Sequence, residues 1–237
     1  MALKVGCCGF PGGRAAAMAR FPVVEVQQTF YDPPTIATLA RWRSVAPADF
    51  EFTLKAWQLI THPASSPTYR RLRRPLPPES AGRVGLFQDT PEVWAAWERT
   101  AAAAATLRAR IVLFQAPPSF QETPENVARL RGFFAKLPRQ GLLCAWEPRG
   151  AWSDGTIAAL CRELRLIHCV DPLEREPLDS ESVRYFRLHG GPHYRGRYDD
   201  GQLRALAERW GHAEGCVLFN NLQMAEDAAR LRALLGA

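Results

Sequence analysis

Residues 111–115 read Ile-Val-Leu-Phe-Gln, a short apolar run that ends in a polar side chain. Such a run is typical of a strand that a parallel sheet buries on both of its faces. Seven more runs of this kind occur, at residues 3–8, 23–27, 50–56, 142–146, 166–170, 183–188 and 216–219. Because parallel neighbours need a crossover between consecutive strands, we expect eight strands that alternate with helices.

Helix-start signals stand between these runs. Pro33 and Pro34 precede residues 35–43, and the Thr-Pro-Glu triplets at 90–92 and 123–125 precede two further helical patterns. Polar residues at 153–154, 199–200 and 225–227 open the later ones. This alternation repeats from end to end, which favours a closed barrel over an open sheet with a reversal of strand order. We predict an α/β fold, a TIM-type (β/α)8 barrel that forms one domain over residues 1–237.

Residues 57–89 form one connection that is too long for this spacing. The segment is rich in proline and arginine, and residues 69–78 read Tyr-Arg-Arg-Leu-Arg-Arg-Pro-Leu-Pro-Pro. A long irregular segment in a compact fold is usually a lid, a binding loop or a mobile loop. Since it follows the third strand, we expect it to overhang the face where the strands end.

Composition and charge place the chain among ordinary globular proteins. Hydrophobic residues make up 47% and charged residues 23%, and the net charge of +6 is a modest excess carried mostly by arginine. The N-terminus lacks a signal-peptide pattern, and no apolar run approaches the roughly 20 residues that span a bilayer. We therefore expect a cytoplasmic protein without membrane contact, with a monomer as the default. The six cysteines show no Cys-x-x-Cys spacing, which indicates small apolar core residues.

Polar and charged residues stand at almost every predicted strand end, where side chains of such a barrel converge. The candidate catalytic residues are Glu25, Lys55, Glu147, Asp171 and His189. The candidate ligand-binding residues are Gln27, Tyr31, Gln115, Arg149, Arg187, Tyr194, Asn220 and Asn221. These groups form either a ligand-facing site or a closed network of ion pairs, because buried carboxylates need cations against them.

Two of these residues have more than one plausible role. Lys55 lies on the strand next to Glu25, so we expect the two to form a salt bridge, with a catalytic base or a Schiff-base lysine as the alternative. His189 precedes two glycines and titrates near neutrality, which suits a general acid or base. A divalent metal held by His189 with the strand-end carboxylates is a further alternative, but no motif with metal-ligand spacing supports it. We assign no metal ligands, and the cofactor stays open.

Several motifs in order along the chain carry a resemblance to a known family. They are residues 24–31 (Val-Glu-Val-Gln-Gln-Thr-Phe-Tyr), 52–55 with 60–62, 113–120, 186–190 and 219–221. In these motifs the chain resembles the YecE-like proteins, domain of unknown function 72, over nearly its whole length. The resemblance implies a (β/α)8 barrel with a strand-end cleft and an unassigned activity. The chain departs from the family pattern at residues 6–10, at Gln27 and at residues 147–152.

Three functions fit these observations. The first is an enzyme, for example a phosphoester hydrolase, that acts on a nucleic acid or a sugar phosphate, with Arg149 and Arg187 holding the anion. In it, His189 with Glu25, Glu147 or Asp171 would move protons or hold a metal. The second is a non-catalytic module that binds nucleic acid or another polyanion through the arginines at residues 70–74. The third is a glycosidase-like hydrolase that uses Glu25 and Glu147 as its pair of carboxyl groups.

Overall fold

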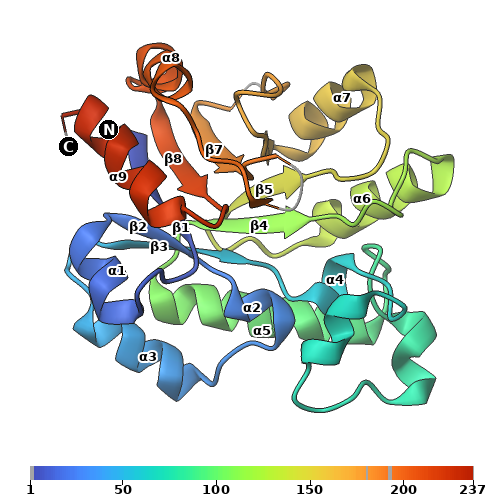
Figure 1. Cartoon of the computed structure of the whole chain (residues 1–237). Coiled ribbons are helices and arrows are strands. Elements are labelled where there is room, and N and C mark those ends of the chain that lie inside the picture. Colours follow the sequence, from blue (N-terminus) through green and yellow to red (C-terminus); the bar gives the residue numbers. More distant parts are fainter. Residues whose placement is uncertain (1–2, 180, 192–193, 237) are drawn as a thin grey trace.

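The computed structural model describes residues 3–179, 181–191 and 194–236. Eight parallel strands form one sheet in the order β6-β5-β4-β3-β2-β1-β8-β7 (Figure 1). The two edge strands meet through a parallel bridge between Val170 and Phe186, and the backbone N–H of Arg187 donates to the carbonyl of Val170 at 2.9 Å. The sheet therefore curls into a nearly closed TIM-type (β/α)8 barrel, which confirms the predicted fold class.

All eight predicted apolar runs are strands. Their bounds are β1 Leu3–Cys8, β2 Val23–Val26, β3 Glu51–Lys55, β4 Ile111–Gln115, β5 Leu143–Glu147, β6 Leu166–His168, β7 Val183–Leu188 and β8 Glu214–Phe219. β6 is two residues shorter than its apolar run, because beyond His168 only the single bridge at Val170 continues the pairing.

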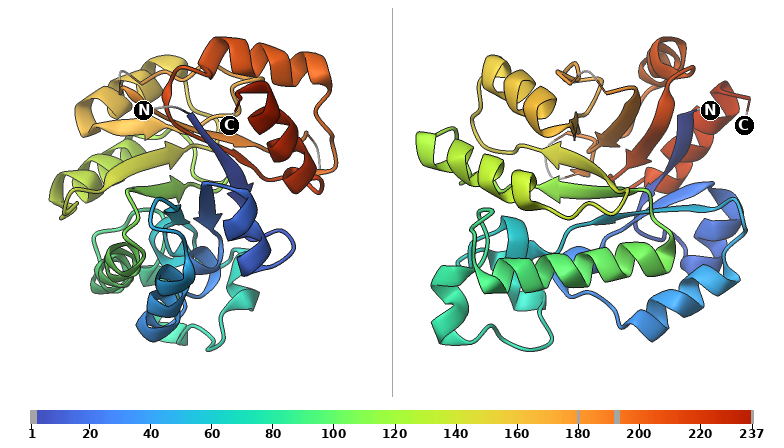
Figure 2. Two further views of the ribbon diagram at one scale, coloured as in Figure 1. Left: turned by 90° about the vertical axis from the view of Figure 1, so that its left-hand side faces the viewer. Right: turned by 180° about the vertical axis from the view of Figure 1, so that it is seen from behind.

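Helices surround the sheet on its outer side (Figure 2). They are α1 Arg14–Arg20, α2 Gln28–Tyr31, α3 Ile36–Val45, α5 Pro91–Leu107, α6 Pro124–Lys136, α7 Asp154–Leu164, α8 Asp200–Trp210 and α9 Met224–Leu234. Four of the predicted start signals include a capping residue, whereas residues 225–227 lie inside α9, whose N-cap residue Gln223 makes no side-chain cap bond. The side chains of Thr90, Thr123 and Ser153 each accept from the backbone N–H three residues on, and Asp199 forms a capping box with Gln202.

The crossover between β6 and β7 departs from the expected alternation. The described residues between the two strands form a turn and extended chain without a helix. Polar side chains hold this segment instead: the backbone N–H of Leu178 donates to His168 Nδ1 at 3.1 Å, and Asp179 accepts from the backbone N–H of His168 at 3.0 Å. Such bonds replace the backbone partners that a helix would supply.

The barrel interior follows the period of two that strands impose on side-chain direction. Small and apolar residues that point inward form one cluster, which includes Ile111, Leu113, Ala145, Val183 and Leu218. Further along these strands the inward positions become polar: Gln115, Glu147, Arg187 and, just after β8, Asn220. The barrel interior is therefore filled with apolar side chains, except at the carboxyl ends of the strands, where a layer of polar side chains covers them.

The segment at residues 57–89 is a folded insertion. It contains α4 Gln58–Thr61 and two short 3₁₀ helices, η1 Pro67–Arg71 and η2 Pro78–Arg83. Its two ends are joined, because Gly85 N–H donates to the carbonyl of Leu59 at 2.7 Å. A side chain at Gly85 would collide with the backbone, since an added Cβ would lie 2.0 Å from the carbonyl oxygen of His62. The insertion is thus anchored directly beyond the end of β3, on the face where we expected it.

Two expectations from composition can be compared with the structure. All six cysteines are buried free thiols, as expected for small core residues. No helix in the described part of the chain has the length and apolar character that crossing a bilayer requires.

Candidate functional site

A pocket of about 310 Å³ opens at the carboxyl ends of the strands. We call it the mouth pocket. Its lining residues come from β3, β4 and β7 and from the segments that follow β2, β3, β7 and β8: Gln27, Phe30, Tyr31, Lys55, His62, Thr68, Gln115, Arg187, Tyr194 and Asn220. Seven of these residues were candidates from the sequence, so the structure does bring distant polar groups to one cavity.

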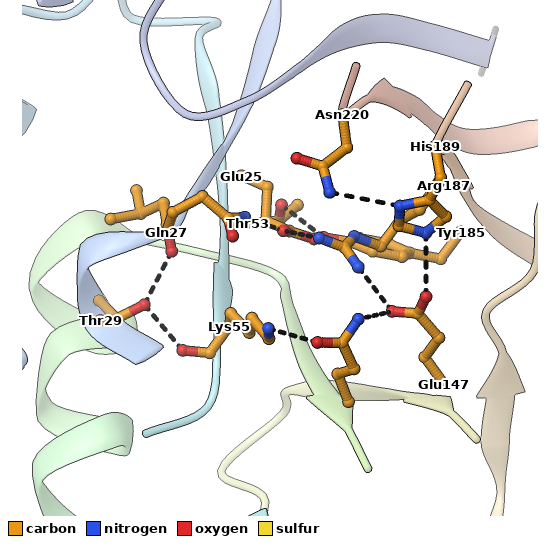
Figure 3. A network of polar contacts seen from close by, with 12 residues as sticks. Glu25, Gln27, Thr29, Thr53, Lys55, Glu147, Tyr185, Arg187, His189 and Asn220 are labelled. Atoms are coloured by element: carbon orange, nitrogen blue, oxygen red, sulfur yellow. Dashed lines mark hydrogen bonds and ion pairs between the residues drawn. The ribbon is translucent and has the colours of Figure 1, made fainter. Parts of the chain in front are cut away.

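Beneath the pocket lies a buried ion-pair network centred on Arg187, which is 1% exposed. Its guanidinium lies between two carboxylates (Figure 3), with NH1 2.6 Å from Glu147 Oε2 and NH2 3.1 Å from Glu25 Oε1. Tyr185 donates to the other oxygen of Glu25 at 2.6 Å, and Thr53 lies 2.8 Å from the Tyr185 hydroxyl. Although burial opposes its charged form, Glu147 and Glu25 raise the pKa of Arg187 well above its ordinary value.

The prediction that Lys55 pairs with Glu25 is wrong. Glu25 is opposite Thr53 in the β2–β3 register, so Lys55 lies one inward position nearer the mouth and Arg187 takes the carboxylate. Lys55 Nζ donates to Gln115 Oε1 at 2.5 Å and lies 3.6 Å from the centre of the Phe30 ring. The described residues supply no carboxylate within salt-bridge distance of it.

This environment changes the acidity of Lys55. Burial, and then the positive charge of Arg187, lower its pKa from 10.5 to about 7, although Glu147 and Glu25 act in the opposite direction. Near neutral pH about half of the molecules then carry an uncharged amine at this position. A neutral amine can accept a proton or attack an electrophile, which a paired ammonium cannot do.

Glu147 joins the network to His189 and Arg149. Its Oε1 lies 2.6 Å from Arg149 NH2 and 3.1 Å from His189 Nε2. Burial alone would raise the pKa of Glu147, but Arg187, the hydrogen bond from His189 and Arg149 hold it well below its ordinary value. His189 does not line the mouth pocket. Asn220 lines the pocket, and its Nδ2 lies 3.3 Å from Nδ1 of His189. His189 therefore belongs to the layer behind the lining.

Asp171 and Asn221 lie near the site but hold the backbone. Asp171 accepts from the backbone N–H groups of Leu173 at 3.1 Å and His189 at 3.2 Å, and burial raises its pKa. Asn221 donates to the carbonyl of Gly196 at 2.9 Å and to Asp227 at 2.8 Å. Both residues therefore fix the chain that leaves β7 and β8, and neither lines the mouth pocket.

Reading candidates only at strand ends missed five residues of the site: Phe30, Thr53, His62, Thr68 and Tyr185. Tyr185 and Thr53 lie two positions before Arg187 and Lys55, on the same inward faces, so the period of two could have identified them. His62 and Thr68 come from the insertion, whose conformation leaves no periodic signal in the sequence. Burial, and then the charge of Lys55, lower the pKa of His62 to about 3, which keeps this ring neutral.

The described residues do not fit a resident divalent cation. No group of three or more His, Cys, Asp or Glu side chains with metal-site geometry occurs in the described ranges. The two carboxylates best placed to bind one, Glu25 and Glu147, already enclose the Arg187 guanidinium. This organic cation neutralises the carboxylates, and we derive no step through a metal.

A larger surface cavity of about 620 Å³ lies elsewhere, beside α5 and the insertion. Its lining is mostly apolar, with Trp57, Leu59, Leu76 and Val84 among its members, and it includes none of the polar strand-end residues. We place the functional site at the smaller mouth pocket, because polar groups that can bind and react converge there.

Comparisons with known proteins agree with this architecture. The model of a family described as "Protein of unknown function DUF72" matches residues 14–237. A DUF72 family protein from Enterococcus faecalis has a solved structure with a TM-score of 0.74 at 21% identity, covering 99% of this chain and 98% of that one. One from Thermotoga maritima gives 0.73 at 19% identity, covering 100% of both chains.

More distant structures share the fold alone. A xylose isomerase domain containing protein from Salmonella typhimurium has a TM-score of 0.58 at 13% identity, covering 95% of this chain and 91% of that one. The search of curated proteins returned no match.

Proposed function

The chain belongs to the DUF72 family of proteins of unknown function, and we propose that it is an enzyme that binds a small phosphate-bearing substrate in the mouth pocket. The observation that carries the proposal is the chemistry of the lining. Amide, hydroxyl, ammonium and guanidinium groups face this pocket, and none of its described lining residues is Asp or Glu. An anion can therefore enter without meeting a carboxylate.

Lys55 offers the anion unused binding capacity, and Arg187 adds positive charge beneath it. Lys55 has a single hydrogen-bond acceptor and no carboxylate partner in the described chain. Arg187 is fully buried with both terminal nitrogens on carboxylates, so its charge acts on a bound anion from below the lining.

The size of the pocket favours a small substrate. At about 310 Å³ it is at the lower end of the range for ligand pockets, roughly 300–1,000 Å³. A sugar phosphate, or one sugar-phosphate unit of a nucleotide, suits such a volume. The reactive group facing it is Lys55, whose pKa of about 7 leaves an uncharged amine available at neutral pH.

The polyanion-binding alternative has its own supporting observation. Arg71 lies over the ring of Tyr31 at 3.5 Å from its centre, and Tyr31 lines the mouth pocket. Arg70 and Arg74 are exposed on the same insertion. A chain of phosphates bound across these arginines would make several contacts, so its affinity would fall steeply with salt.

The glycosidase alternative receives less support. That chemistry needs one carboxyl group that stays protonated as the acid. Glu147 has a pKa far below its ordinary value and stays charged, and Glu25 is bound to the same guanidinium.

Calorimetric titration tests the proposal. Ribose 5-phosphate and ribose are titrated into the wild type, Lys55→Met and the control Lys136→Met, whose lysine is exposed and pairs with Asp89. We expect ribose 5-phosphate to bind the wild type and Lys136→Met with the same affinity, and Lys55→Met at least about tenfold more weakly. We also expect the wild type to bind ribose 5-phosphate more tightly than ribose. Equal affinities for ribose and ribose 5-phosphate would contradict the proposal.

The same titration at two salt concentrations separates the alternatives. A pocket that holds one phosphate predicts a shallow salt dependence, equivalent to about one to two ionic contacts. Tight binding of a ten-nucleotide single strand with a steep salt dependence, together with no binding of ribose 5-phosphate, would favour the polyanion-binding module.

A further inference from the structure

We propose that Lys55 is a nucleophile that forms an imine with the carbonyl carbon of an aldehyde or ketone bound in the mouth pocket. This inference rests on the proposed function for the phosphate and adds the substrate class, a phosphate-bearing carbonyl compound. Its chemistry depends on three features of the amine of Lys55: its position, its single hydrogen-bond acceptor and the charges around it.

The first part is the position of the amine. Lys55 is 5% exposed and still lines the pocket, so protein atoms shield its amine on one side and a ligand can reach it on the other. The ring of Phe30, whose centre lies 3.6 Å from Nζ, covers the amine on one side. A lysine that only stabilised the fold would be tied to a carboxylate, as Lys4 is to Glu51 at 2.8 Å.

The second part is the single acceptor that holds the amine. Gln115 Oε1 accepts from Nζ at 2.5 Å, and Gln115 Nε2 donates to Glu147 Oε2 at 2.9 Å. Because Glu147 is a fixed acceptor, it orients the amide so that oxygen faces Lys55. A neutral acceptor positions the amine without favouring its protonation, whereas a carboxylate in this place would raise the pKa of Lys55.

The third part is the balance of charge around Nζ. The charged or titratable groups that act on it come from β7, β5, β2, β1 and the insertion: Arg187, Glu147, Glu25, Cys8 and His62. Arg187 opposes the ammonium form, and its own charge neutralises much of the effect of the two carboxylates. A desolvated lysine beside another cation is a recognised arrangement for a nucleophilic amine.

The proposed step is balanced without a cofactor. Neutral Nζ attacks the carbonyl carbon, the C–N bond forms, and the π electrons move to the oxygen, which takes up a proton as Nζ releases one. Nζ of the resulting carbinolamine then releases its second proton, the hydroxyl group leaves with a proton as water, and the nitrogen lone pair forms the C=N bond. The net change converts one amine and one carbonyl into one imine and one water, with no oxidation or reduction.

Reductive trapping tests this step on the wild-type protein. The chain contains only Lys4, Lys55 and Lys136, so peptide mass spectrometry assigns each adduct to one position. The probes are pyridoxal 5′-phosphate and glyceraldehyde 3-phosphate, each with cyanoborohydride at about pH 7. We expect Lys55 to be modified at least about tenfold faster than Lys4 or Lys136, because the amines of Lys4 and Lys136 are each paired with a carboxylate and that of Lys55 is not. Equal rates at all three lysines, or adducts on Lys4 and Lys136 alone, would overturn the proposal.

Two controls keep the result interpretable. Lys55→Arg should lose only the adduct at position 55, and if that variant does not fold, protection of wild-type Lys55 by inorganic phosphate provides the same information. Trapping of glyceraldehyde as fast as glyceraldehyde 3-phosphate, with no protection by phosphate, would support the imine and refute the phosphate site. Calorimetric binding of ribose 5-phosphate without any adduct on Lys55 would support the phosphate site and refute the imine.

Discussion

Replacing Lys55 with methionine should stabilise the protein at neutral pH, and the gain should shrink in alkaline solution. Burial and then Arg187 lower the pKa of this lysine from 10.5 to about 7 in the folded chain. Between these values the unfolded chain holds more protons than the folded one, so the free energy of unfolding of the wild type rises with pH. Below about pH 7 both states are charged and the full cost of burying the ammonium is present.

The size of the effect follows from the two pKa values. A fall from 10.5 to about 7 corresponds to roughly 5 kcal/mol, at about 1.4 kcal/mol for each tenfold change in proton affinity. About 3 kcal/mol of this cost should disappear from the wild type between about pH 7 and pH 9.5. Methionine has a similar length and no charge, so its stability carries no such contribution.

Urea unfolding followed by tryptophan fluorescence, in steps from about pH 7 to pH 9.5, measures this difference. Buried cysteines and tyrosines also titrate as the pH rises, but they are the same in both proteins and cancel when the two curves are subtracted. Lys136→Met, which changes an exposed lysine, should run parallel to the wild type. A Lys55→Met curve that also stays parallel within about 1 kcal/mol would show that Lys55 keeps an ordinary proton affinity, and the reasoning would fail.

Three other substitutions test the surroundings of the site. Arg187→Met leaves the buried Glu25 without a cation and Glu147 with Arg149 alone, and should cost about 3–5 kcal/mol in urea unfolding; a loss below about 1 kcal/mol would argue against the buried network. Tyr185→Phe removes one buried hydroxyl, so it should cost about 1–2 kcal/mol in the same measurement, and no loss would contradict its bond to the carboxylate. Gly190→Ala should lower the melting temperature more than Gly191→Ala does. Both glycines have a φ near 68°, but only a Cβ at Gly190 would lie 2.6 Å from the carbonyl oxygen of Gly196, so equal losses would refute the steric argument.

Much of the fold could be predicted from the sequence because its signals are local. A run such as residues 111–115 is apolar at every buried position. Thr90 caps α5 and Ser153 caps α7, each at the residue just before its helix. These patterns depend on neighbours within a few residues. The β6–β7 crossover could not be predicted in this way, since His168 and Asp179 replace its helix with side-chain hydrogen bonds.

The sequence by itself determined that eight strands close into one barrel and that polar residues gather where those strands end. Only the tertiary structure decided the partners. Register and barrel closure bring Arg187 to Glu25 from 162 positions away, leave Lys55 without a carboxylate and place His189 behind the pocket lining. The physical reason is that alternation along a strand sets the face of a side chain, whereas its partner across the barrel depends on how all the strands are staggered.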